Sequence, residues 1–322
     1  MASGHRLRVS GSALLRVAAI ALVAVVAIAL LPTRAYAWTP GTHIFLGDAI
    51  MRSLTLIPAA VGDLLRAFPY DFLYGSIAAD TSFAKKYAPV GRHCHSWTVG
   101  LEIFDRARDD PLRSFALGYL AHLAADAVAH NYFVPKQLAV TSSTASLGHS
   151  YWESRFETHL GERYSRRARD IILLDHGSSD ALLDRVLSPT IFSTATNRRI
   201  FRGMVYAADS ESWQRIFQIM LENSRWDLPD EEVADYLVRS FNFIVDFLNR
   251  IDRSEAYRLD PSGDERLRLA KRVRRSVLRA RGRDVERLES EARRHFGMPP
   301  SALDYETRID GPLYLPNRVA SN

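Results

Sequence analysis

The chain has 322 residues, a hydrophobic content of 47% and a formal net charge of +5. This hydrophobic fraction is sufficient for a large buried core, and a single cysteine, Cys94, excludes an intramolecular disulfide. Residues 1–37 contain four arginines and no acidic residue, so the net charge of the remainder falls from +5 to +1. The high isoelectric point therefore does not indicate a nucleic-acid-binding protein.

The first 37 residues have the three parts of a cleavable signal peptide. Arginines precede Val17–Leu31, an uncharged apolar run, and Ala35-Tyr36-Ala37 has small residues at the cleavage positions. The run is shorter than the about 20 residues that span a bilayer. We therefore expect cleavage after Ala37 and export to the periplasm or the extracellular space. An uncleaved anchor is the alternative.

After the leader, apolar residues recur at helical spacing, and no segment shows convincing β-alternation, a repeat or a glycine-rich phosphate loop. Asp109-Asp110-Pro111 is expected to end one helix, and residues 140–148 to form a polar loop. Residues 115–133 form the longest apolar helix, which we expect at the centre of the protein. The predicted helices span residues 45–56, 61–68, 99–108, 115–133, 151–167, 182–187, 197–208, 211–223 and 231–249. The sequence therefore predicts an all-α protein.

The composition changes near residue 252. Nine lysines and arginines and no acid lie between Arg266 and Arg283, and prolines and glycines follow in an irregular stretch. We therefore divide the chain into a signal peptide (1–37), a catalytic domain (38–250) and a basic C-terminal tail (251–322). The favoured interpretation of the tail is a solvated helix that its charges hold against the domain. The alternative is a peripheral contact with anionic lipid head groups, worth about 1 kcal/mol per cation.

The long helix carries three metal-ligand side chains in register. His122, Asp126 and His130 lie at i, i+4 and i+8, within about 80° of one another on one helix face. Polar groups buried in an apolar helix cost several kcal/mol unless they meet partners or a metal ion. His149 and Glu153 repeat the i, i+4 spacing, although such a pair alone is often a surface ion pair. Imidazole and carboxylate together suit zinc.

Other candidate ligands precede the long helix, and Trp38 would chelate through its amine and carbonyl once the leader is removed. His93 is an alternative to His95, and Cys94 between them is interpreted as a half-buried free thiol. His159, His176 and His295 are interpreted as ordinary residues. The candidate ligands are Trp38, His43, Asp80, His95, His122, Asp126, His130, His149 and Glu153. Nine residues are too many for one tetrahedral ion and suit two or three, and ions about 3.5–4 Å apart can act together on a phosphodiester.

This ordered series of ligands behind a signal peptide resembles the zinc-dependent phospholipase C family. That group includes the bacterial phosphatidylcholine-type enzymes, clostridial α-toxin and the phospholipase C/D domain of the glycosylphosphatidylinositol-specific phospholipase D. The P1/S1 nucleases are distant relatives with the same plan. The resemblance implies a compact helical bundle around two or three zinc ions, with water attacking phosphorus in line.

The resemblance also implies how the ligands are shared. One zinc ion would be bound by Asp80, His95, His122 and Asp126, a second by His130, His149 and Glu153, and a third by Trp38, His43 and Asp126. Asp80 matches an acid that is proposed to act as base as well as ligand, and Asp126 would bridge two ions. Asp80 and Asp126 are therefore the predicted catalytic residues.

Two features depart from the secreted bacterial phospholipases. The short gap between Asp126 and His130, and the sequence of residues 42–47, are closer to the phospholipase D-type branch, so the P–O bond that is cut stays open. The predicted function is a secreted zinc-dependent phosphodiesterase that hydrolyses phospholipids in a phospholipase C-like manner, with nucleic acid not expected as a partner.

Three alternatives are kept. They are a phospholipase D-type hydrolase, a P1/S1-like nuclease and a non-catalytic metal-binding surface module. A nuclease requires aromatic side chains that stack on bases at the rim of the site. The candidates for that role are Tyr132, Phe133, Tyr151 and Trp152.

Overall fold

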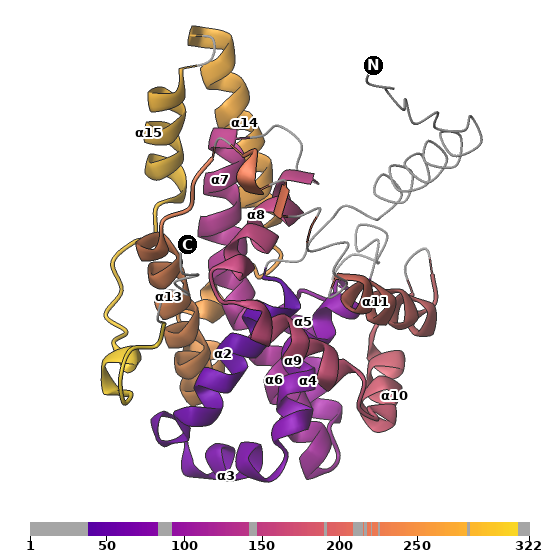
Figure 1. Ribbon diagram of the computed structural model, residues 1–322. Helices are drawn as coiled ribbons and strands as arrows, with labels where there is room; N and C mark the ends of the chain where they lie inside the picture. Colours follow the sequence, from indigo (N-terminus) through magenta and orange to yellow (C-terminus); the bar gives the residue numbers. More distant parts are fainter. Residues whose placement is uncertain are drawn as a thin grey trace, which may run out of the picture. The chain divides into compact units, whose positions relative to one another are not determined.

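The computed structural model describes residues 38–82, 92–141, 147–189, 192–208, 226–281 and 284–314, together with 215, 218–219 and 221–224. Within these ranges every regular element is a helix and no strand occurs, which confirms the predicted all-α class (Figure 1). By its internal packing the chain divides into Met1–Thr33, outside the described residues, and Arg34–Asn322, which contains every element named below. Among the described helices, none combines the length and apolar character needed to cross a bilayer.

The α-helices are α2 (Pro40–Arg52), α3 (Ala59–Ala67), α4 (Pro69–Ala78), α5 (Trp97–Arg106), α6 (Asp110–Val128), α7 (Val134–Thr141), α8 (Leu147–Thr158), α9 (Glu162–Ile172), α10 (Gly177–Val186), α11 (Thr194–Ala208), α13 (Asp230–Arg250), α14 (Asp264–Arg281) and α15 (Val285–Phe296). The short 3₁₀ turns are η1 (Leu54–Leu56), η2 (Ala79–Thr81), η5 (Ile251–Arg253), η6 (Ala256–Arg258) and η7 (Tyr305–Arg308). One π-helical turn, η4 (Ala129–Phe133), connects α6 to α7.

Several helix boundaries differ from the sequence prediction for local reasons. The acidic pair before Pro111 begins α6, because the Asp109 side chain accepts a hydrogen bond from the amide of Leu112 at 2.9 Å. The segment predicted as one helix over 151–167 is two helices, α8 and α9, separated at Gly161 with φ of 83°. The helix predicted over 211–223 lies largely outside the described residues.

Helices α4 and α6 approach each other so closely that their backbones touch. A Cβ atom at Gly75 would overlap the carbonyl oxygen of Phe115, and one at Gly118 would overlap that of Phe72. Glycine is therefore needed on both sides of this contact. The close approach brings the C-terminal end of α4, and η2 after it, beside the middle of α6, where the predicted ligands lie.

The C-terminal elements pack beside the second half of the central helix. Helices α14 and α15 run side by side against α7 (Figure 1). The guanidinium of Arg274 is buried there and donates to the carbonyl oxygens of Ala139 and Val140, at 3.2 and 2.5 Å. These two carbonyls belong to the last turn of α7, where intrahelical donors run out. The C-terminal segment thus supplies hydrogen-bond donors to the last turn of α7, the helix that follows η4.

Candidate metal centre

Five predicted ligands, from three helical elements and one loop, meet in one buried cluster, and each has at most 2% of its surface exposed. His95 Nε2 lies 2.9 Å from Asp126 Oδ2, 3.0 Å from His122 Nε2 and 3.3 Å from Asp80 Oδ1. His43 Nε2 lies 3.2 Å from the other Asp126 oxygen, Oδ1. The two oxygens of Asp126 therefore face different histidines.

The distances in this cluster fit zinc. Bonds of about 2.0–2.2 Å in a tetrahedron place neighbouring donor atoms roughly 3.3 Å apart. The donor atoms around His95 Nε2 lie 2.9 to 3.3 Å from it. Both oxygens of Asp126 are buried near imidazole nitrogens, yet neither accepts a hydrogen bond of regular geometry. A buried carboxylate in this setting requires a cation to offset its lost hydration.

The electrostatic environment favours the metal-binding protonation states. Burial alone would raise the pKa of Asp126, but the facing His122, His43 and His95 outweigh it and hold that pKa well below its usual range. Burial and the neighbouring His122 lower the pKa of His43. Near neutral pH, Asp126 is therefore anionic and His43 neutral, as coordination requires.

A second cluster lies next to the first. The ligand atoms of His130, His149 and Glu153 lie within 4.8 Å of one another, and all three residues are buried. His149 Nε2 is 2.6 Å from Glu153 Oε1, as expected from their i, i+4 spacing. The rings of His95 and His130 are 6.1 Å apart between centroids, so the two clusters are neighbours.

Backbone carbonyls orient one histidine in each cluster. His122 Nδ1 lies 2.9 Å from the carbonyl oxygen of Ser76, and His130 Nδ1 lies 2.6 Å from that of Pro261. A carbonyl can only accept, so Nδ1 carries the proton and Nε2 keeps its lone pair for a metal ion. The sequence analysis did not identify Ser76 or Pro261, because a backbone acceptor leaves no signal in residue type.

The structure brings His95, and not His93, to the first cluster. Among the described residues His93 groups only with Cys94 and His95, and its Nδ1 accepts a hydrogen bond from the backbone N–H of His95 at 3.0 Å. Cys94 forms no disulfide, as expected, and its Sγ lies 3.3 Å from His95 Nδ1. It is fully buried rather than half-buried, with 3% exposed.

Trp38 is buried beside the same helix. Its indole Nε1 donates to the carbonyl oxygen of Ala125 at 3.2 Å, one residue before Asp126. Its ring packs on Phe133 and Phe156, with centroids 5.2 and 4.2 Å away. The indole therefore fixes the start of α2 beside α6, and metal binding by the Trp38 main chain stays a prediction.

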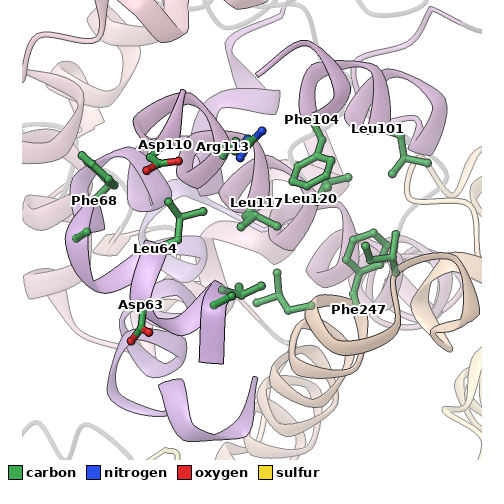
Figure 2. A pocket seen from close by; sticks show the side chains of 15 residues that line it. Asp63, Leu64, Phe68, Leu101, Phe104, Asp110, Arg113, Leu117, Leu120 and Phe247 are labelled. Carbon is green, nitrogen blue, oxygen red and sulfur yellow. The ribbon is translucent and has the colours of Figure 1, made fainter. Parts of the chain in front are cut away.

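A separate cavity of about 510 Å³ lies between α3, α5, α6 and the end of α13. Figure 2 shows Leu64, Phe104, Leu117, Leu120 and Phe247 around it, with Asp63, Asp110 and Arg113 among the lining residues. None of the nine predicted ligands lines this cavity. The predicted ligands therefore lie away from this cavity.

The helices and the buried histidine–carboxylate clusters define an all-α protein whose donor groups fit zinc. Residues 42–192 match the model described as zinc-dependent phospholipase C, so the chain contains a domain of the zinc-dependent phospholipase C family. The match bears out the predicted family and supports a phospholipase C-like hydrolase, and the family implies a phospholipid substrate. No curated protein and no solved structure gave a match. Trp38 and the whole segment after residue 192 lie outside the matched residues.

Proposed function

We propose that the protein is an exported, zinc-dependent phosphodiesterase that hydrolyses phospholipids in the manner of a phospholipase C. The observation that carries this proposal is the convergence of eight buried histidine and carboxylate ligands in two adjacent clusters. Their donor types, without thiolate, are typical of catalytic rather than structural zinc. Neighbouring clusters of this kind suit two or three ions.

The proposed chemistry is attack of water on phosphorus, with cleavage of the P–O bond to diacylglycerol. Zinc held by these residues would supply a water that is nucleophilic near neutral pH and would offset charge on the phosphoryl oxygens. Asp80, buried beside His95, would accept the proton of the attacking water at a carboxylate oxygen. Asp126, with one oxygen toward His43 and the other toward His95 and His122, would keep the ligands of two ions in register.

The nuclease alternative receives less support. Phe133 and Trp152 are 0% and 1% exposed, and Tyr132 is 8% exposed, because they pack in the interior. Aromatic side chains that bind single-stranded nucleic acid must present a face to the bases. Of the four candidates only Tyr151 is partly accessible, and its hydroxyl donates to Ser224 at 2.6 Å.

The deciding experiment measures zinc content and turnover on one sample of leader-processed protein. Phosphatidylcholine vesicles and single-stranded DNA are supplied in parallel, before and after zinc is removed with a chelator and restored. We expect two to three zinc ions per chain and release of phosphorylated head group that is lost with the metal. Release of free head group would instead identify phospholipase D-type cleavage. Turnover of DNA alone would assign the nuclease, and bound zinc without turnover would favour the binding module.

Export and processing are tested on the same sample. N-terminal sequencing of protein recovered outside the cytoplasm is expected to begin at Trp38. An additional residue before Trp38 would leave its nitrogen in a peptide bond, and would contradict a metal site that uses the free amine.

We also propose that α14 contacts anionic lipid surfaces. Arg268, Arg272, Arg275 and Arg279 follow one another at spacings of four, three and four residues, so they form one row on an exposed helix face. Only Arg268 has an acidic partner among the described residues, Asp264 at 3.9 Å.

The arginines of α15 differ, because each exposed one pairs with an acid on its own helix. Arg287 and Arg294 lie 3.1 and 3.7 Å from Glu291, and Arg293 lies 3.7 Å from Glu289. The α14 row therefore has the uncompensated charge that attracts lipid phosphates, at about 1 kcal/mol per cation.

Vesicle sedimentation distinguishes the two helices. Replacing Arg272, Arg275 and Arg279 with glutamine is expected to weaken binding to phosphatidylserine-containing vesicles roughly 100-fold. The matched control replaces Arg287, Arg293 and Arg294 with glutamine, which changes the net charge equally. Equal losses for both variants would contradict a specific lipid-binding face on α14.

A further inference from the structure

The ligand-bearing helix contains a proline shortly after His130. In a regular α-helix the amide of residue 135 would bond to the carbonyl oxygen of Asn131, but residue 135 is proline and has no N–H. Arg266, at the start of α14, donates from Nε to this carbonyl oxygen at 3.2 Å. The same guanidinium donates to the carbonyl oxygen of His295 at 2.8 Å. A side chain from the C-terminal segment thus supplies the missing donor.

The side chain of Asn131 adds a second connection. Its Nδ2 donates at 2.8 Å to the carbonyl oxygen of Ala127 and at 2.8 Å to that of Asp260. The first acceptor is on the ligand-bearing helix and the second is in the turn before α14. The π-helical turn is therefore held by both its own helix and residues far along the chain.

The turn at residues 260–263 contacts His130 directly. The carbonyl oxygen of Pro261 receives the Nδ1 proton of His130 at 2.6 Å. Gly263 follows with φ of 59°, and a Cβ atom there would overlap both the Cβ and the carbonyl oxygen of His130. Only glycine combines this backbone conformation with this approach.

We propose that residues 260–266 are positioning residues for the second metal cluster, holding the His130 ring at the angle and in the tautomer that zinc requires. The proposal rests on the zinc binding proposed above. It extends that function to residues outside the family-matched segment, 42–192. The C-terminal segment would then be part of the metal centre rather than an appendage to it.

The test is zinc affinity in the full-length, leader-processed protein. Zinc is titrated against a chromophoric chelator, and cobalt absorption spectra report ligand geometry without any activity measurement. Gly263→Ala is expected to lower affinity at one class of site by roughly 10–100-fold, the usual effect of disturbing groups that orient a ligand. The other sites should keep wild-type affinity.

Gly311→Ala is the matched control. Gly311 also has a positive φ, 81°, but a Cβ atom there meets nothing within 4 Å. Both substitutions introduce backbone strain in the C-terminal segment, and only Gly263→Ala displaces His130. Equal zinc affinity in the two variants would overturn the proposal while leaving wild-type zinc binding intact. Absence of zinc from the wild type would overturn the proposed function and this inference with it.

Arg266→Gln provides a second variant in case Gly263→Ala does not fold. It removes the donor to Asn131 without adding volume, and Arg293→Gln on the neighbouring α15 is its control, because Arg293 is 65% exposed. We expect weaker zinc binding and an altered cobalt spectrum only for Arg266→Gln. A wild-type cobalt spectrum and zinc affinity in Arg266→Gln would contradict the role of this segment.

Discussion

The two ends of the ligand-bearing helix are supported in different ways. His122 and Asp126 lie on the regular helix α6, which α4 backs through the glycine contact and through the Ser76 carbonyl at 2.9 Å from His122. His130 lies on the π-helical turn η4, and the Pro261 carbonyl and Gly263 back it from beyond residue 250. The first support is inside the family-matched segment and the second is outside it.

This difference indicates how the site is built. The series of ligands typical of the family identifies the donor side chains at both ends of the helix. The backbone carbonyls that fix their orientation belong to the neighbouring segments that pack against the helix. At the α6 end that neighbour is a second helix of the same domain, and at the η4 end it is a turn preceding α14. Zinc affinity at the η4 end should therefore respond to changes in the C-terminal segment, whereas affinity at the α6 end should not.

The largest effect is expected from Asp126→Asn, which disturbs the first cluster without touching the second. One carboxylate oxygen faces His43 and the other faces His95 and His122, so an amide cannot replace both. We expect turnover of phosphatidylcholine to fall at least roughly a thousandfold, about 4 kcal/mol of barrier. Zinc bound by the second cluster should remain, as measured by metal content after dialysis.

Asp170→Asn on α9 is the control for Asp126→Asn, because Asp170 is 67% exposed. Its turnover and zinc content should match the wild type. Near-wild-type activity in Asp126→Asn would contradict a shared role for this carboxylate.

An intermediate effect is expected where α4 supports α6. Gly118→Ala forces a methyl group against the Phe72 carbonyl oxygen, which should lower the free energy of unfolding by about 3 kcal/mol. Separation of the helices should also weaken zinc binding at the first cluster more than at the second. Chemical denaturation measures the stability and competitive titration the affinity.

Gly203→Ala on α11 separates this clash from the general effect of removing a helical glycine. A Cβ atom at Gly203 meets nothing within 4 Å, so the substitution should raise stability by up to about 1 kcal/mol. A neutral or stabilising effect of Gly118→Ala would contradict the close helix contact.

The helical class and the ligand pattern could be predicted from the sequence, because helical periodicity and i, i+4 spacing are local properties. His122, Asp126 and the pair His149 and Glu153 follow this spacing, and the structure brings their side chains together. The choice between His93 and His95 could not be made from the sequence, because the side chains of a loop have no fixed direction. Only the cluster around Asp126 distinguishes them.

Long-range contacts account for most of what the sequence did not predict. Pro135 lacks the N–H that would bond to the Asn131 carbonyl oxygen in a regular α-helix, and Arg266, far along the chain, donates to that oxygen. The sequence shows glycine at positions 75 and 118, but it does not show that the helices carrying them touch there. The assignment of residues 251–322 to a separate tail stays a prediction, although residues 260–266 contact His130 and Asn131.

The smallest effect is expected from Trp38→Phe, which tests a support that the two ends share. The indole donates to the Ala125 carbonyl beside Asp126, and its ring packs on Phe133 in η4. Phenylalanine keeps most of the packing and loses one buried hydrogen bond, so stability should fall by about 1 kcal/mol. The main chain is unchanged, so zinc affinity at both clusters should shift by the same small factor. A loss of zinc affinity at one cluster only would show that the indole supports that cluster alone, and would contradict its role as a support for both ends of the helix.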